Sequence, residues 1–146
     1  MPTPLPDVPC CLNGEFSRAC DAKVSVLDRG FLFGDGIYEV VPVYGRRLFR
    51  FDEHLARLAR NLAKVRIPDP HPREQWLRLC RELVQRLAAQ TGAEDQVVYI
   101  QVTRGVAPRD HAMPPDAVPT VFMMVNPMRP PTAEQRQVAH QHLAKH

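Results

Sequence analysis

Apolar and polar residues alternate over several short stretches of the chain, a pattern typical of β-strands. Residues 10–18 predict two short strands around Asn13-Gly14, a dipeptide that supplies the positive φ angles of a tight hairpin turn. Residues 36–51 predict a long strand, a turn at Gly45 and a second strand. Pro42 lies within the first of these strands and cannot donate a ladder hydrogen bond, which predicts an edge position or a bulge.

Two longer segments have helical spacing. Asp52, a favourable N-cap residue, precedes a helix predicted over residues 52–66, whose inward side would carry Leu55, Leu58, Leu62 and Val65. A second helix is predicted from Pro72, which favours a first turn, to Gly92, which favours a C-terminal stop. Its apolar side would carry Trp76, Cys80, Leu83, Val84 and Leu87.

The apolar runs 96–105 and 119–126 are too short for helices and rich in β-branched and aromatic residues, so we expect central strands. Strands, two helices and further strands, without regular β-α alternation, predict an α+β domain with a largely antiparallel sheet and both helices on one face. Prolines crowd both ends of the chain. We therefore expect an N-terminal arm over 1–8, a packed domain over 9–126 and a linker or tail over 127–146.

Composition limits the classes of protein to consider. With 146 residues, 45% of them hydrophobic, the chain is long enough for one domain. Its net charge of +3 arises from dispersed charges, which argues against nucleic acid as a partner. It has neither an apolar run of about 18 residues nor a signal-peptide pattern, so we expect a soluble, cytoplasmic protein without a membrane partner.

The residues that most often bind metal do not have metal-site spacing. The four cysteines show no C-x-x-C pair, so ordinary reduced thiols are favoured over a zinc site or a disulfide: Cys10, Cys11, Cys20 and Cys80. Three histidines lie in the tail, and we expect solvated side chains there: His140, His142 and His146.

Three glycines precede the long strand at Gly30, Gly34 and Gly36. Their spacing matches neither a dinucleotide-binding loop nor a phosphate loop, and they predict a tight turn entering a strand. Alternation places Tyr38 and Glu39 on opposite faces of that strand. The face of Tyr38 is either core or the wall of a cleft, and the pattern leaves both open. An acid pair of Glu39 with Asp35 is disfavoured, because strand geometry separates them.

Two groups of basic residues are candidates for binding anions. Arg57 lies roughly opposite the leucine side of its helix, where it could bind a phosphate, although a solvated helix arginine is the simpler interpretation. The loop 103–115 follows a strand and carries Arg104, Arg109 and His111. The last two are donors two residues apart, which suits a carboxylate. An ordinary proline-rich surface loop is about equally compatible with the pattern.

Taken together, these segments resemble the class IV (fold-type IV) pyridoxal-phosphate aminotransferases, and most closely the D-amino acid aminotransferases. The likeness runs from about Leu12 to about Asn126 and rests on three motifs in this order: DRGFLFGDGIYEV, EHLARL and TRGVAPRDH. The joint occurrence of these motifs is far more specific than any one glycine pattern. The resemblance implies the N-terminal domain of that fold and pyridoxal 5'-phosphate as the cofactor.

The resemblance also implies roles for four residues. Arg57 matches the arginine that binds the cofactor phosphate, and Tyr38 matches the tyrosine that lines the site beside the cofactor. Arg109 and His111 match the pair that holds the substrate α-carboxylate together with that tyrosine, typically reaching into the neighbouring subunit of a homodimer. The same pair separates this branch from the branched-chain aminotransferases and the aminodeoxychorismate lyases.

In this family the Schiff-base lysine lies at the start of a second domain, in a motif like DIKSLNLL, which these residues do not contain. None of the lysines Lys23, Lys64 and Lys145 lies in such a motif. We therefore expect the N-terminal domain of an enzyme that transfers the amino group of a D-alanine-like amino acid to a 2-oxo acid, inactive by itself. The alternatives are a non-catalytic module that self-associates or binds anions, and, within the family, branched-chain transamination or lyase activity.

Overall fold

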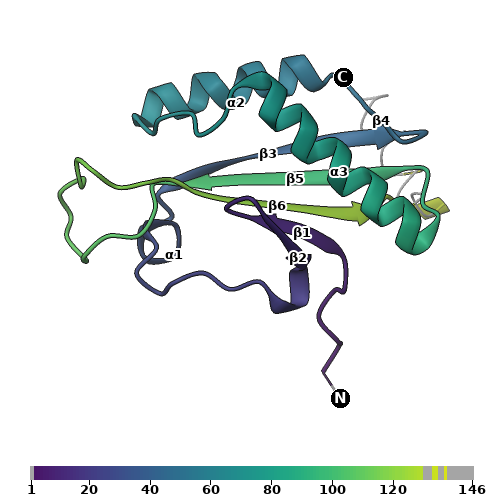
Figure 1. Ribbon diagram of the computed structural model, residues 1–146, viewed down its shortest axis with the longest axis horizontal. Helices are drawn as coiled ribbons and strands as arrows, with labels where there is room; N and C mark the ends of the chain where they lie inside the picture. The colour runs from purple at the N-terminus through teal and green to yellow at the C-terminus, as the bar shows by residue number, and fades with distance from the viewer. Residues whose placement is uncertain (1, 130–132, 135–136, 138–146) are drawn as a thin grey trace.

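The computed structural model describes residues 2–129, 133, 134 and 137, and its centre is a six-stranded antiparallel sheet (Figure 1). The strands lie side by side in the order β2-β1-β6-β5-β3-β4. Their bounds are β1 Pro9–Leu12, β2 Glu15–Arg18, β3 Gly36–Tyr44, β4 Arg47–Leu48, β5 Gln96–Thr103 and β6 Thr120–Pro127. This order confirms β5 and β6 as central strands and confirms the predicted largely antiparallel α+β fold.

The two predicted hairpin turns are present. Asn13 and Gly14 have φ angles of 51° and 87°, which suit the tight turn between β1 and β2. Gly45 has a φ angle of 55° in the turn between β3 and β4. β4 is only two residues long, shorter than predicted. Beyond the end of β4, the Phe49 amide donates to the Pro42 carbonyl at 2.8 Å. The backbone of Pro42 therefore faces the side of β4, where few ladder hydrogen bonds form and the missing N–H of proline is tolerated.

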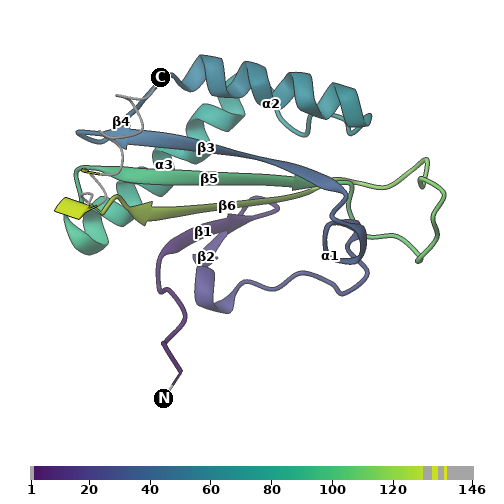
Figure 2. The same ribbon diagram turned by 180° about the vertical axis from the view of Figure 1, so that it is seen from behind.

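Helices α2 (Phe51–Val65) and α3 (Arg73–Thr91) both cover one face of the sheet, as Figures 1 and 2 show from opposite sides. Gly92 ends α3 in the left-handed conformation, as predicted. The prediction that Asp52 caps α2 was wrong. The N-cap position belongs to Arg50, and Asp52 lies in the first turn, where its charge favours the helix dipole and its Oδ1 accepts from Arg73 Nε at 2.6 Å.

The core lies between the helices and the sheet. Valine, isoleucine and methionine side chains of the central strands pack against the predicted inward sides of both helices, including Leu58, Leu62, Trp76, Leu83 and Leu87. All four cysteines are free thiols, as predicted, and burial raises the pKa of Cys80 to about 12. Within the described ranges, no helix is both long enough and apolar enough to cross a bilayer.

The glycine-rich segment before β3 contains a helix that was not predicted, α1, over Arg29–Phe33. The side chain of Asp28 caps it by accepting from the Gly30 amide at 2.8 Å, and Gly34 ends it with a φ angle of 65°. A Cβ at Gly36 would lie 2.7 Å from the carbonyl oxygen of Val102 on β5, so only glycine fits there. The glycines thus allow a one-turn helix to pack closely against the end of β5. A short 3-10 helix, Ala19–Asp21, follows β2.

Candidate functional site

Arg57 on α2 is fixed by Glu39 on β3. Its Nε donates to Glu39 Oε2 at 3.0 Å and its Nη2 donates to Oε1, so the guanidinium and the carboxylate meet as two forks. His54, one turn earlier on α2, holds Nδ1 2.7 Å from the same Oε1. The Glu39 side chain is 2% exposed, whereas that of Arg57 is 56% exposed. A buried acid therefore holds a half-exposed arginine at the surface.

The carboxylate of Glu39 stays charged despite its burial. Burial by itself would raise the pKa of Glu39, but the hydrogen bonds from Arg57 and His54 outweigh it and hold that pKa below its ordinary value. The sequence pattern suggested for Glu39 only a disfavoured pair with Asp35. The structure confirms that these two acids do not pair, since each bonds to basic side chains. The signal that identifies Glu39 is its position as the one charged residue on the inward, otherwise aliphatic face of β3.

Arg57 retains donor capacity for a ligand. Within the part of the chain that the structure describes, its Nη1 group makes no hydrogen bond. Glu39 orients one side of the guanidinium and also bonds to His54, so the other side of Arg57 faces away from that carboxylate. An arginine that is oriented on one side and free on the other fits the binding of a phosphate oxygen.

Tyr38 lies on the opposite face of β3 from Glu39 and Arg57. Its side chain is 64% exposed and stacks on Tyr99 of β5, with ring centroids 5.8 Å apart and an interplanar angle of 27°. Partial burial and the neighbouring Tyr38 raise the pKa of the Tyr99 hydroxyl. Tyr99 was not singled out from the sequence, because it lies within a continuous apolar run. The structure does not bring Tyr38 and Arg57 together on one face of the sheet.

Arg109 and His111 do lie together, around Phe33 of α1. The Arg109 guanidinium carbon is 5.7 Å from the centre of the Phe33 ring, and the His111 ring is also 5.7 Å from it, tilted by 51°. Both basic side chains belong to exposed residues of the loop between β5 and β6. Two donors exposed beside one aromatic ring can bind a carboxylate and exclude water from one side of it.

Asp35 joins the two segments that build this corner. It accepts from Arg104 Nε at 2.7 Å and from Arg29 Nε at 2.9 Å, and all three side chains are at most 15% exposed. Burial would raise the pKa of Asp35, but the bonds from Arg104 and Arg29 outweigh it and lower that pKa. Arg104, which the sequence placed in the candidate loop with Arg109 and His111, is a buried structural cation.

Arg104 also ties this corner to the end of α2. Its Nη2 donates to the Val65 carbonyl at 2.7 Å and its Nη1 donates to the Arg66 carbonyl at 3.1 Å. These are among the last carbonyls of α2, which have no partner within the helix. One arginine at the end of β5 thus holds both the carboxylate of Asp35 and a helix C-terminus, so it has little capacity left for a ligand.

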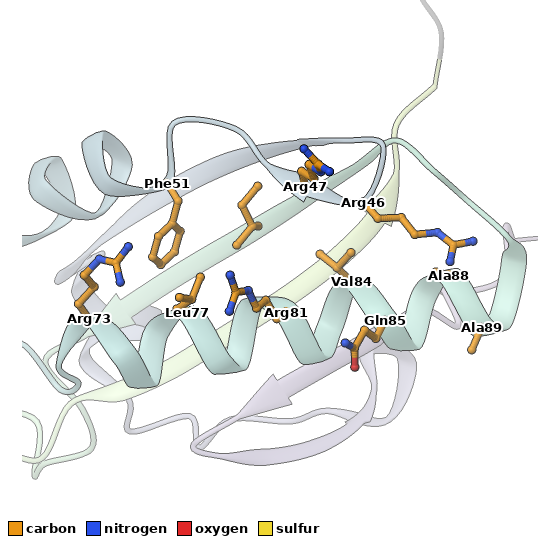
Figure 3. A pocket seen from close by; sticks show the side chains of 11 residues that line it. Arg46, Arg47, Phe51, Arg73, Leu77, Arg81, Val84, Gln85, Ala88 and Ala89 are labelled. Atoms are coloured by element: carbon orange, nitrogen blue, oxygen red, sulfur yellow. The ribbon is translucent and has the colours of Figure 1, made fainter.

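A groove of about 800 Å³ lies between β4 and α3 on the helix side of the molecule (Figure 3). Four arginines line it over an apolar floor: Arg46, Arg47, Arg73 and Arg81. Two of them form ion pairs, Arg46 with Glu94 at 2.9 Å and Arg73 with Asp52. None of the predicted site residues lines this groove. The predicted histidines of the tail and Lys145 lie outside the described residues.

Comparisons with known proteins agree on one family. The family model for amino-transferase class IV matches residues 36–146. A D-alanine aminotransferase of Staphylococcus aureus (strain N315) is 43% identical over 111 residues, which are 75% of this chain and 38% of that protein. One of Listeria monocytogenes is 43% identical over 106 residues, which are 72% of this chain and 35% of that protein. The chain thus spans little more than a third of the length of these relatives.

Solved structures share the fold. The branched-chain amino acid aminotransferase of Escherichia coli superimposes with a TM-score of 0.74 and 21% identity, covering 88% of this chain and 42% of that one. A hypothetical aminotransferase of Mycobacterium tuberculosis, in its PLP-bound form, gives a TM-score of 0.70 at 24% identity, covering 84% of this chain and 40% of that one. At these identities the likeness concerns the arrangement of strands and helices.

Proposed function

The chain belongs to the class IV aminotransferase family, and from this premise we propose that residues 9–126 form the N-terminal domain of a D-amino acid aminotransferase. The family match confirms the resemblance identified from the sequence. The complete enzyme would transfer the amino group of a D-alanine-like amino acid to a 2-oxo acid. The observation that carries this proposal is the gathering of Arg109 and His111, exposed, around Phe33.

We propose that the complete enzyme uses pyridoxal phosphate and that Arg57 binds its phosphate. The fit of Arg57 to that group rests on its orientation by Glu39 and on its Nη1, which has no hydrogen-bond partner among the described residues. When bound, the cofactor serves as an electron sink for the α-carbon of the amino acid. Glu39 and His54 would keep the guanidinium in one orientation, so that little side-chain entropy is lost when the phosphate binds.

Arg109 and His111 would hold the α-carboxylate of the substrate, with Tyr38 lining the same site. Arg57, on α2, lies on the helix face of the sheet, whereas Tyr38 lies on the opposite face. The loop of Arg109 lies elsewhere, beside Phe33 of α1. One copy of this domain therefore offers its candidate groups in separate places, which supports a homodimer in which the loop of one subunit completes the site of the other. Charged hydrogen bonds from Arg109 and His111 would orient the carboxylate.

The lysine that bonds the cofactor would come from a part of the enzyme that these 146 residues do not include, so we expect this chain alone not to transaminate. Incubation with pyridoxal phosphate, D-alanine and 2-oxoglutarate checks this. Sustained turnover would contradict it, as would a shift of the cofactor absorbance that disappears on Lys145→Ala.

The decisive experiment for the proposed reaction uses the complete coding region. It is read beyond residue 146 for a DIKS-like motif, and the full-length protein is expressed and assayed with D-alanine or L-leucine as the amino donor and 2-oxoglutarate as the acceptor. Preference for D-alanine supports the proposal. Preference for L-leucine would replace it with branched-chain transamination.

A non-catalytic module is the second candidate, because one face of the sheet carries exposed apolar side chains: Tyr38, Val40 and Tyr44. Such a face would cause the chain to self-associate. Light scattering across a dilution series measures this, with a change in mass expected if the face pairs with a second copy. A strict monomer without affinity for phosphate would exclude this candidate.

A further inference from the structure

Arg29, the first residue of α1, is a buried arginine that reaches into the loop between β5 and β6. Its residue is 5% exposed. Its Nε donates to Asp35 Oδ2 at 2.9 Å, and its Nη1 donates to the backbone carbonyl of Asp110 at 2.7 Å. Asp110 lies between Arg109 and His111 in the chain, so this one hydrogen bond acts at the centre of the candidate carboxylate-binding segment.

The start of the same loop is also fixed to the α1 segment through the backbone. The Arg29 amide donates to the Gly105 carbonyl at 2.9 Å, and Asp28 forms an isolated antiparallel bridge with Val106. After Ala107, whose amide is 3.4 Å from the Leu27 carbonyl, no further backbone hydrogen bond within the described residues ties the loop to α1. The side chain of Arg29 is the next link along the loop.

The aromatic contacts converge on the same place. The guanidinium carbon of Arg29 lies 4.7 Å from the centre of the Phe33 ring, and that ring in turn contacts Arg109 and His111. Arg29 therefore holds the backbone between the two candidate residues and also helps to fix the ring against which they pack.

The chemistry of this position requires arginine. A buried cation is costly unless it is paired, and Asp35 supplies the counter-charge. The planar guanidinium still has donors directed elsewhere, so one side chain can bond a carboxylate and a carbonyl in two different segments. A lysine ammonium is a single point with a different reach, and we expect it to satisfy Asp35 without fixing Asp110.

We propose that Arg29 is a positioning residue that sets the place of Arg109 and His111. It does not touch the substrate and acts through the carbonyl of Asp110. The ordering of the loop by Arg29 stands by itself, and only the identity of what the loop binds, an α-carboxylate, rests on the proposed function.

The ordering is tested on the 146-residue chain by ¹⁵N relaxation of its backbone amides. In the unmodified chain we expect order parameters of about 0.85 at Asp110, His111 and Ala112, as in a rigid backbone. In Arg29→Gln they should fall below about 0.6 while β5 is unchanged. Arg29→Lys should lie between these values. The matched control is Arg86→Gln, which removes another arginine with one ion pair, to Glu82, and should leave the loop unaffected.

Two results would overturn the proposal: a loop that is already mobile in the unmodified chain, or one that stays rigid in a folded Arg29→Gln or Arg29→Lys chain. The first needs no variant, so a variant that fails to fold does not leave the proposal untested. In the full-length enzyme, Arg29→Lys should raise KM for D-alanine about tenfold and leave the affinity for pyridoxal phosphate unchanged. An equal weakening of the apparent affinity for D-alanine and of the affinity for pyridoxal phosphate would indicate a general structural role. Failure of the D-alanine assay itself would count against the proposed function, whereas the relaxation result would stand.

Discussion

Tyr38 and Glu39 are neighbours on β3, yet their side chains lie on opposite faces of the sheet, and the two residues are 64% and 3% exposed as wholes. Tyr38 therefore belongs to the open face, where it stacks on Tyr99, and Glu39 belongs to the helix face, where it holds Arg57. The two-residue period of a strand thus assigns two candidate groups of one site to different sides of the molecule.

Replacing Glu39 by glutamine should lower the free energy of unfolding by about 1–3 kcal/mol, because the charged hydrogen bonds of a buried carboxylate are lost. Urea unfolding of the 146-residue chain measures this. The matched control is Glu53→Gln, which alters an exposed ion pair with Arg50 and should cost less than about 0.5 kcal/mol. Equal effects of the two substitutions would show that the pair of Glu39 and Arg57 contributes no more than a surface contact.

Arg57→Gln should weaken the binding of pyridoxal phosphate to the full-length enzyme by about tenfold or more, since one charged phosphate contact is lost. Arg57→Lys should weaken it less, and Arg60→Gln, an exposed arginine of the same helix, should have no effect. Equilibrium dialysis with the cofactor gives the three dissociation constants. Equal affinity of the Arg57→Gln variant and the unmodified enzyme would remove Arg57 from the site.

The stability of the chain should fall in acid because of Asp35 and Glu39. Both have a pKa that is lower in the folded state than in the unfolded chain, where values are about 3.9 and 4.3. Their stabilisation is therefore fully present above the unfolded pKa and is lost as the pH falls through the folded pKa. Thermal melting between about pH 7 and pH 2 should show this loss, and it should be smaller in Asp35→Asn and in Glu39→Gln. A pH dependence unchanged by either substitution would contradict the assignment.

Gly105→Ala should displace the start of the loop that carries Arg109 and His111. Gly105 has a φ angle of 104°, and a Cβ there would lie 1.9 Å from the carbonyl oxygen of Val118. Backbone must move to accept it, so we expect a loss of more than about 2 kcal/mol in the free energy of unfolding. Gly45→Ala, at a φ angle of 55° with no atom within 4 Å, is the control and should cost about 1 kcal/mol. Similar losses for the two variants, measured by urea unfolding, would contradict the steric argument.

Several elements could be predicted because their signals are local. The Asn13-Gly14 hairpin depends on two residues that adopt positive φ angles, and the end of α3 depends on Gly92. Where several local signals compete, prediction failed. Asp52 has the chemistry of an N-cap, but the chain enters α2 through Arg50 directly from the turn after β4, so Asp52 lies two residues past the N-cap position.

The helix α1 was missed for a related reason. It is five residues long and contains Gly30, and its stability comes from Asp28 and from contacts with the end of β5. A helix of one turn has too little periodicity to be detected in a sequence, and glycine disfavours it by propensity. The packing of Gly30 and Gly36 against β5 and the left-handed conformation of Gly34 together explain the three glycines of this segment.

The sequence by itself determined the class of the fold, most of its strands and helices, and the family, because these follow from periodicity, turn residues and the order of three motifs. Only the tertiary structure decided which charges meet. Glu39 and Arg57 are 18 positions apart, Asp35 and Arg104 are 69 apart, and Arg29 and Asp110 are 81 apart. No local pattern encodes such pairs, since each depends on how two distant elements pack before a carboxylate or carbonyl and a guanidinium come within hydrogen-bonding distance.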